Sequence, residues 1–144
     1  MSDGCELPQG NPPAEAIRAL LLRTKTIAVV GHSDDPSRPS HRVGRYLAAH
    51  GYEVFAVNPA GRPSPGLVFH PDLASLPKPI DVVDIFRKVE HIPAIVDEAI
   101  RIGAKAIWMQ DGLAHNASAA KARAAGLEVV QSRCMLRDHA SLIG

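Results

Sequence analysis

Apolar runs and helical segments alternate five times along this chain of 144 residues. The apolar runs are nearly continuous and rich in β-branched residues, and they do not alternate between apolar and polar positions. Such runs are typical of parallel strands that are covered by helices on both faces. The expected strands are residues 26–31, 53–58, 81–86, 104–109 and 127–130. Because parallel strands need right-handed crossovers, the sequence predicts an α/β fold, a doubly wound five-stranded parallel sheet in three α/β/α layers.

Helices are expected where apolar residues recur at helical spacing and a glycine often follows. The expected helices are residues 14–23, 40–50, 91–102 and 116–125. Ser40 is the candidate N-cap of the second helix. After the second strand, residues 67–70 predict a short extended piece and residues 71–77 one helical turn. The segment from Ser132 onward has no clear pattern.

Length and composition indicate a single globular domain, with a hydrophobic content of 46%. We expect this domain over residues 13–144, behind a flexible N-terminal tail of residues 1–12. The chain has 16 basic and 15 acidic residues, which gives no broad positive surface for nucleic acid or an anionic membrane. No apolar run reaches the roughly 20 residues that a membrane span needs.

Cysteine and histidine usage points to a reduced compartment and to no metal site. Cys5 and Cys134 lie far apart, which argues against a disulfide framework. The N-terminus is acidic and polar, unlike a signal peptide, so we expect a cytoplasmic protein. The 7 histidines form no spacing that is typical of a zinc site.

The end of the first strand predicts an anion site. The strand ends at Gly31 and Ser33, a proline-rich loop follows, and a helix begins near Ser40. A strand, a turn and a helix N-terminus in this order bind anions through backbone N–H groups and the helix dipole. Because the loop is long and Arg38 and Arg42 lie near it, we predict that this corner holds a diphosphate.

Two common ligands of such sheets are disfavoured. After Gly31 the next glycine is Gly44, so the chain lacks the Gly-x-Gly-x-x-Gly fingerprint of NAD-dependent oxidoreductases. The second strand ends in Asn58–Pro59 rather than in the acidic residue that binds an NAD ribose. A phosphoacceptor domain would need an aspartate at the end of the third strand, where Phe86 and Arg87 stand.

Several separated motifs together resemble one known family. They are Val30-Gly31-His32-Ser33, Arg38-Pro39-Ser40-His41, Val57-Asn58-Pro59, Asp81-Val82-Val83-Asp84-Ile85-Phe86-Arg87 and Ala104-Lys105-Ala106-Ile107-Trp108-Met109-Gln110. In this order they resemble the small stand-alone coenzyme A-binding proteins of bacteria. That family is similar to the CoA-binding domain of the succinyl-CoA synthetase alpha subunit. The resemblance covers residues 14–140 and implies a Rossmann-like fold.

The resemblance also implies where CoA would bind. Residues after the first strand are expected at the diphosphate, those after the second beside the 3′-phosphorylated ribose, and those after the third beside the adenine. From the residues themselves, Arg62 is a cation in reach of the 3′-phosphate, and Gln110 is polar at a strand end. The expected CoA-binding residues are Gly31, His32, Ser33, Arg38, Ser40, His41, Asn58, Pro59, Arg62, Phe86, Arg87 and Gln110.

We therefore expect a non-catalytic module that binds CoA or an acyl-CoA. The alternative is a subunit of a CoA-dependent ligase, which would act with another chain because no second domain fits in 144 residues. A homo-oligomer or an unknown protein partner stays open. Cys134 also leaves two alternatives, a small packing residue or a thiol that forms a mixed disulfide with CoA.

Overall fold

Six parallel strands form one sheet in the order β3-β2-β1-β4-β5-β6. The computed structural model describes residues 6–144, so Cys5 lies outside the described residues. The strands are β1 (Thr26–Val30), β2 (Glu53–Val57), β3 (Phe69–His70), β4 (Val82–Ile85), β5 (Ala106–Met109) and β6 (Glu128–Val130). The doubly wound parallel sheet is confirmed. The sixth strand is the two-residue β3, which lies in the short extended piece expected over residues 67–70.

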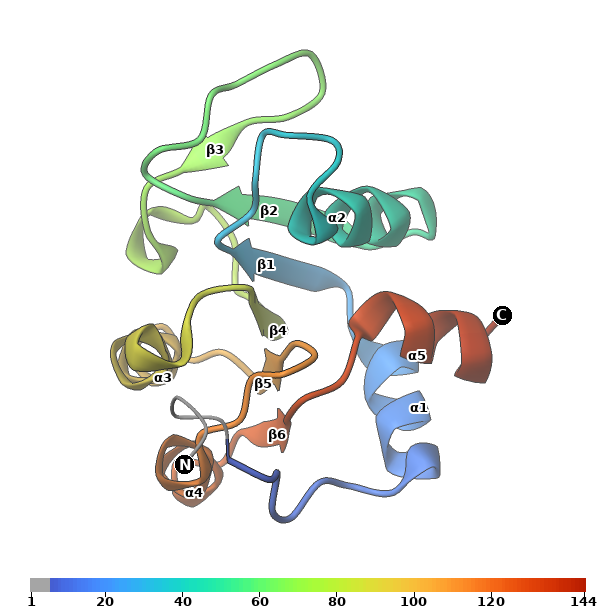
Figure 1. Ribbon diagram of the computed structural model, residues 1–144, viewed down its shortest axis with the longest axis vertical. Helices are drawn as coiled ribbons and strands as arrows, with labels where there is room; N and C mark the ends of the chain where they lie inside the picture. The colour runs from blue at the N-terminus through green and yellow to red at the C-terminus, as the bar shows by residue number, and fades with distance from the viewer. Residues whose placement is uncertain (1–5) are drawn as a thin grey trace.

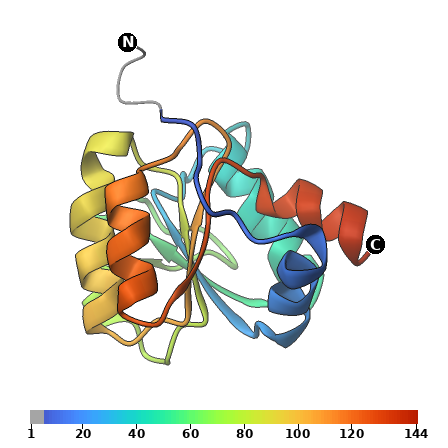
Figure 2. The same ribbon diagram turned by 90° about the horizontal axis from the view of Figure 1, so that it is seen from below.

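Helices cover both faces of the sheet. They are α1 (Ala14–Arg23), α2 (Pro39–Ala49), α3 (Ile92–Arg101), α4 (Asn116–Ala124) and α5 (Met135–Leu142), with short 3-10 turns η1 (Leu73–Ser75) and η2 (Val89–His91). Figure 2 shows α3 and α4 side by side on one face and α1, α2 and α5 together on the other. No helix within residues 6–144 has the length and apolarity that crossing a bilayer requires.

Each face of the sheet has its own apolar cluster. One cluster lies under α3 and α4 and includes Val83, Ile85 and Ile107. The other lies under α1, α2 and α5 and includes Val29 and Trp108. Trp108 is fully buried, and its indole Nε1 donates a hydrogen bond to the Arg133 carbonyl oxygen at 2.7 Å. It is a core residue, as its place in a buried strand predicts.

A charged residue type lies in the centre of this apolar sheet. Asp84 of β4 is paired with Val29 on one side and Trp108 on the other. It is 0% exposed, and neither carboxyl oxygen has a hydrogen-bond partner. Burial raises the pKa of Asp84 well above its ordinary value, because water no longer stabilises the charge. Burial therefore favours the neutral acid over the carboxylate in the folded protein.

The segment before α1 runs along the end of β6 and the start of α4 (Figure 1). The Asn11 side chain donates from Nδ2 to the Gln131 carbonyl and accepts from the Gln131 amide at its Oδ1, both at 2.8 Å. The Gln9 amide donates to Asn116 Oδ1 at 3.0 Å. These residues of the expected tail thus have specific partners in the domain, and the flexibility of residues 1–12 as a whole stays a prediction.

Candidate functional site

The strand order reverses between β1 and β4, and the residues that follow these two strands meet there. Gly31 follows β1 and has φ of +88°, a conformation that glycine adopts without strain. A Cβ atom at this position would lie 2.9 Å from Arg87 Cδ and 3.0 Å from the Phe86 carbonyl oxygen. The glycine therefore lets the two strand ends approach closely, at the edge where doubly wound sheets bind ligands.

The loop after β1 is held by Ser33 and Ser40. The Ser33 amide donates to Ser40 Oγ at 2.8 Å, and Ser33 Oγ accepts from the Asp35 amide at 3.0 Å. The expectation that Ser40 is the N-cap of α2 is wrong. The helix begins at Pro39 and its N-cap is Arg38, because proline is favourable at the first helical position. Ser40 lies in the first turn and ties the loop to the helix.

Two histidine side chains contact the backbone of the same loop. His32 Nδ1 and His41 Nδ1 both lie within hydrogen-bond distance of the Ser33 carbonyl oxygen, at 2.8 and 2.9 Å. Because a carbonyl only accepts, both rings carry a proton on Nδ1. The His32 ring is only 2% exposed and packs on α2, where a Cβ on Gly44 would lie 2.5 Å from its Nε2. Burial is the main cause that lowers the pKa of His32. The nearby His41 lowers this pKa further, and the hydrogen bond to Ser33 partly offsets both effects.

A cavity of about 350 Å³ opens above this loop and is suited to an anion. Its lining comes from the loop, from the start of α2 and from the end of β4, namely Gly31, Ser33, Arg38, Pro39, Ser40 and Phe86. No side chain within residues 6–144 caps the N-terminus of α2. The first backbone N–H groups of a helix have no partner within the helix, and they favour negative charge. The corner thus offers N–H donors, hydroxyls and one arginine to an anion.

The residues after β2 lie beside this loop. Asn58 Nδ2 donates to the His32 carbonyl at 3.0 Å, and the Asn58 amide donates to the His70 carbonyl at 2.9 Å. Asn58 therefore joins β2, β3 and the loop after β1. Arg62 is tied to the loop through its amide, which donates to Asp34 Oδ2 at 2.9 Å, while its side chain is 91% exposed. The structure brings Asn58, the exposed Pro59 and Arg62 to one side of the corner.

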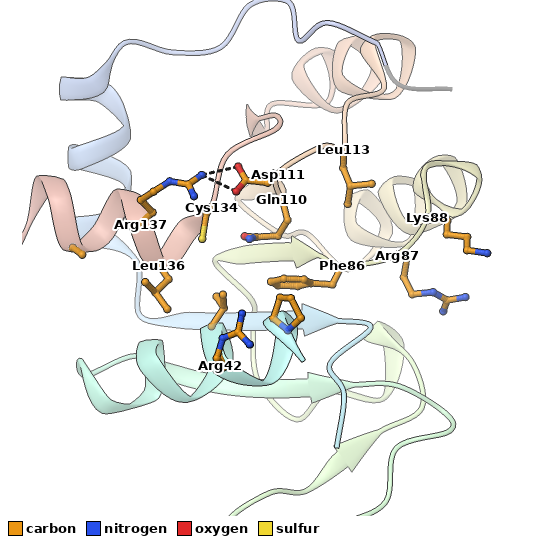
Figure 3. Close-up of a pocket in the computed structure, with 13 residues that line it drawn as sticks. Arg42, Phe86, Arg87, Lys88, Gln110, Asp111, Leu113, Cys134, Leu136 and Arg137 are labelled. Atoms are coloured by element: carbon orange, nitrogen blue, oxygen red, sulfur yellow. Dashed lines mark hydrogen bonds and ion pairs between the residues drawn. The ribbon is translucent and has the colours of Figure 1, made fainter. Parts of the chain in front are cut away.

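A larger cavity of about 800 Å³ lies on the other side of the corner (Figure 3). It lies between α2, α5 and the ends of β4 and β5, and it shares Pro39 and Phe86 with the smaller one. The lining residues are Pro39, Arg42, Val43, Phe86, Arg87, Lys88, Gln110, Asp111, Leu113, Cys134, Leu136, Arg137 and Ala140. An apolar cavity with few polar groups is the usual form of a small-molecule site.

Gln110 is the buried polar group of this larger cavity. It is 6% exposed, and its Oε1 accepts from the Met135 amide at 3.2 Å. Within residues 6–144 its Nε2 has no hydrogen-bond partner, and Figure 3 shows the amide pointing into the cavity. A donor in this position is available to an acceptor on a ligand.

Unpaired cations surround both cavities. Arg38, Arg42, Arg87 and Lys88 form no ion pair within the described residues. Arg87 in particular does not pair with Glu90, the carboxylate three residues further along the chain. Arginine and lysine side chains bind phosphate groups through charge-assisted hydrogen bonds. The described chain holds no cluster of metal-ligand side chains that would favour a cation instead.

The lining from α5 is absent from the sequence-based set. Leu136, Arg137 and Cys134 line the larger cavity, as do Arg42 and Lys88. The sequence gives little signal for α5, because two of its three buried residues are Asp138 and His139. Arg137 donates to both carboxylate oxygens of Asp111, at 2.8 and 2.6 Å, and so links α5 to the loop after β5.

Comparison with known proteins gives a consistent assignment. The CoA binding domain family matches residues 25–140. The YneT protein of Bacillus subtilis (strain 168) is 35% identical over 130 residues, which are 90% of this chain and 96% of that protein. A solved structure from Pyrococcus horikoshii OT3 has a TM-score of 0.90 and 39% identity, and covers 96% of this chain and 98% of that one.

A larger enzyme shares the fold. The dinucleotide forming acetyl-coenzyme A synthetase 1 of Ca. Korarchaeum cryptofilum has a TM-score of 0.64 at 24% identity. The similar region is 73% of this chain and 25% of the synthetase chain. At this identity the similarity concerns the fold alone. The family match, by contrast, extends over most of the chain, which therefore belongs to the CoA binding domain family.

Proposed function

We propose that this protein binds coenzyme A, with the diphosphate in the corner between β1 and α2. The observation that carries the proposal is the uncapped N-terminus of α2, which lies over a cavity lined by Gly31, Ser33 and Ser40. Backbone N–H groups and the helix dipole favour a phosphate at such a place. Arg38 on the rim adds a positive charge without an ion-pair partner among residues 6–144.

The two ends of CoA then extend to opposite sides of the corner. The adenosine and its 3′-phosphate lie toward the loop after β2, where Asn58, Pro59 and the exposed Arg62 stand. The pantetheine arm extends into the cavity of about 800 Å³, past Phe86 and Pro39, which line both cavities. Phe86 and Arg87 stand at the start of this path in the proposal, and not beside the adenine as the resemblance implies, because both line the larger cavity. The Gln110 amide donates to an amide carbonyl of the arm.

Several groups in the predicted set act by holding the loop in this proposal. The buried His32 ring and the Asn58 amide are already hydrogen-bonded to the loop backbone. They position the Ser33 and Ser40 region, and the contacts to the diphosphate and the pantetheine arm come from the groups that line the two cavities.

We infer a binding module without chemistry of its own. A ligase that passes a phosphoryl group through a histidine would need a histidine with access to the ligand. No histidine lines either of the two cavities within the described residues, and His32 and His41 both donate Nδ1 to Ser33. The second candidate is a subunit that supplies the CoA-binding part of a larger enzyme, which the shared fold with one quarter of a synthetase chain favours.

Thermal shift measurements with CoA, dephospho-CoA, acetyl-CoA, NAD and NADP test the proposal. A ligand that binds only the folded state raises the melting temperature. We expect a clear rise with CoA, a smaller rise with dephospho-CoA and none with NAD. Absence of a rise with CoA, or a rise with NAD alone, would contradict the proposal.

A charge placed in the corner gives a second, residue-level test. Ser33→Glu puts a carboxylate beside the diphosphate and should abolish CoA binding through like-charge repulsion. Ala120→Glu adds the same charge on the exposed side of α4 and serves as the matched control. Equal affinity of the two variants for CoA, measured by calorimetry, would mean that the corner is not the phosphate site.

A further inference from the structure

Cys134 lies in the larger cavity and has no role in the fold that requires a thiol. It precedes α5 as its N-cap residue, makes no side-chain cap hydrogen bond and is half-buried. It is a free cysteine, and no other stands within residues 6–144. Figure 3 shows its sulfur pointing into the cavity, near Gln110 and Leu136. A thiol in this place faces whatever fills the cavity.

A second and independent observation indicates a ligand beside this sulfur. The Gln110 side chain is more than nine-tenths buried, and its Nε2 points into the same cavity without a partner among the described residues. An amide donor that faces a cavity and has no acceptor in the protein is available to a carbonyl oxygen of a ligand. The pantetheine arm of CoA carries two amide carbonyls and ends in a thiol, so it offers acceptors to Gln110 and a sulfur to Cys134.

Two arginines lie near Cys134 in the chain, and each is paired with a carboxylate. Arg137 is held by two hydrogen bonds to Asp111, which with the charge of Asp111 raise the pKa of its guanidinium. A thiolate at Cys134 would raise the same pKa further, because the guanidinium and the sulfur would attract each other. Arg133, the preceding residue, is instead occupied by Asp138 at 2.6 Å.

We propose that Cys134 undergoes thiol–disulfide exchange with CoA disulfide and thereby carries CoA as a mixed disulfide. This inference rests on the proposed function, because the cavity must hold the thiol end of CoA. The Cys134 thiolate attacks one sulfur of the CoA disulfide. A bond forms between Cys134 Sγ and that sulfur, the original S–S bond breaks, and the second CoA leaves as a thiolate that takes a proton from water.

The exchange needs no other oxidant. One disulfide is replaced by another, so CoA disulfide is the species that is consumed and free CoA is the product. A small thiol can attack the mixed disulfide in the reverse sense, which releases the second CoA and restores the Cys134 thiol. The fraction of the protein that carries CoA would then depend on the ratio of disulfides to thiols in the surrounding solution.

Intact-protein mass spectrometry on the full chain tests the exchange. Cys5→Ser leaves Cys134 as the single thiol, and Cys134→Ser leaves Cys5. With CoA disulfide, Cys5→Ser should gain the mass of one CoA less two hydrogen atoms, and Cys134→Ser should gain it no faster than it gains glutathione from glutathione disulfide. Because the site holds the reacting sulfur in place, the reaction should be at least about tenfold faster than with glutathione disulfide.

A CoA thioether, whose sulfur cannot exchange, separates this inference from the proposed function. It should raise the melting temperature of both variants and slow adduct formation on Cys134. A melting-temperature rise without an adduct on Cys134, or an adduct that glutathione disulfide forms equally fast and the thioether does not slow, overturns the inference and leaves CoA binding intact. No melting-temperature rise with the thioether or with CoA overturns both.

Discussion

Replacement of Asp84 by asparagine should change how stability depends on pH. The carboxyl group is fully buried in the central strand β4, without a hydrogen-bond partner, and burial raises its pKa well above the ordinary value. Asparagine has nearly the same shape but cannot ionise. Both proteins therefore bury a polar group at this position, at a similar cost in folding free energy. They differ because only the carboxyl group of the wild type can gain or lose a proton.

The sign and size follow from linkage. In the unfolded chain an aspartate ionises near about pH 3.9, whereas folded Asp84 stays protonated to a higher pH. Above the unfolded pKa, folding must take up a proton, so the free energy of unfolding falls by about 1.4 kcal/mol for each pH unit up to the folded pKa. Below the unfolded pKa both states are protonated and the cost is absent. The variant lacks this dependence.

Urea unfolding over about pH 4–7 measures the difference, and the gap should widen with rising pH in favour of Asp84→Asn, by at most about 1.4 kcal/mol per pH unit. Asp97→Asn, which removes a surface carboxylate that pairs with Lys121, is the control and should show no such widening. Parallel pH profiles of the wild type and Asp84→Asn would refute a neutral carboxyl group in β4.

Three further predictions test the loop, the cations and the helix α5. Gly44→Ala drives a Cβ into the buried His32 ring, and the strain of about 1–3 kcal/mol should outweigh the gain in helix propensity and lower the urea midpoint. Arg87→Ala should weaken CoA binding by about tenfold in calorimetry; the exposed Arg101→Ala should not, and equal losses would count against a role for Arg87. Burial, and to a lesser extent the neighbouring His50, lower the pKa of His139. The free energy of unfolding should therefore fall as the pH drops below about 6.5, and it should fall less steeply in His139→Gln. Identical pH dependence of the two proteins in urea unfolding would contradict this.

The sheet could be predicted because its strands are continuous apolar runs between helical segments. Each of the five predicted strands exists, and β3 was missed as a strand because only two residues pair with β2. The start of α2 was misplaced because Ser40 has the chemistry of a cap, while Pro39 at the first helical position sets the boundary one residue earlier. In both cases the local sequence fits two alternatives: an extended piece or a paired strand at β3, and a start at Ser40 or at Pro39 for α2.

The larger cavity could not be predicted because it depends on α5. Two of the three buried residues of α5 are Asp138 and His139, so its inner face breaks the apolar spacing that marks a helix. Asp138 is buried through its pair with Arg133, and His139 through its hydrogen bond with the Tyr46 hydroxyl, at 2.9 Å. Such long-range polar partners appear only once the fold is known, and the same holds for the lining that α5 supplies.

The hydrogen bonds of Asn11 affect the outer border of the sheet. At an unprotected edge, free N–H and C=O groups can pair with a strand of another molecule. The Asn11 side chain occupies both the N–H and the C=O of Gln131, directly after β6, as a neighbouring strand would do. The opposite border is formed by β3, which is only 2 residues long. With Gln131 occupied at one border and a very short strand at the other, self-association through added strands is disfavoured.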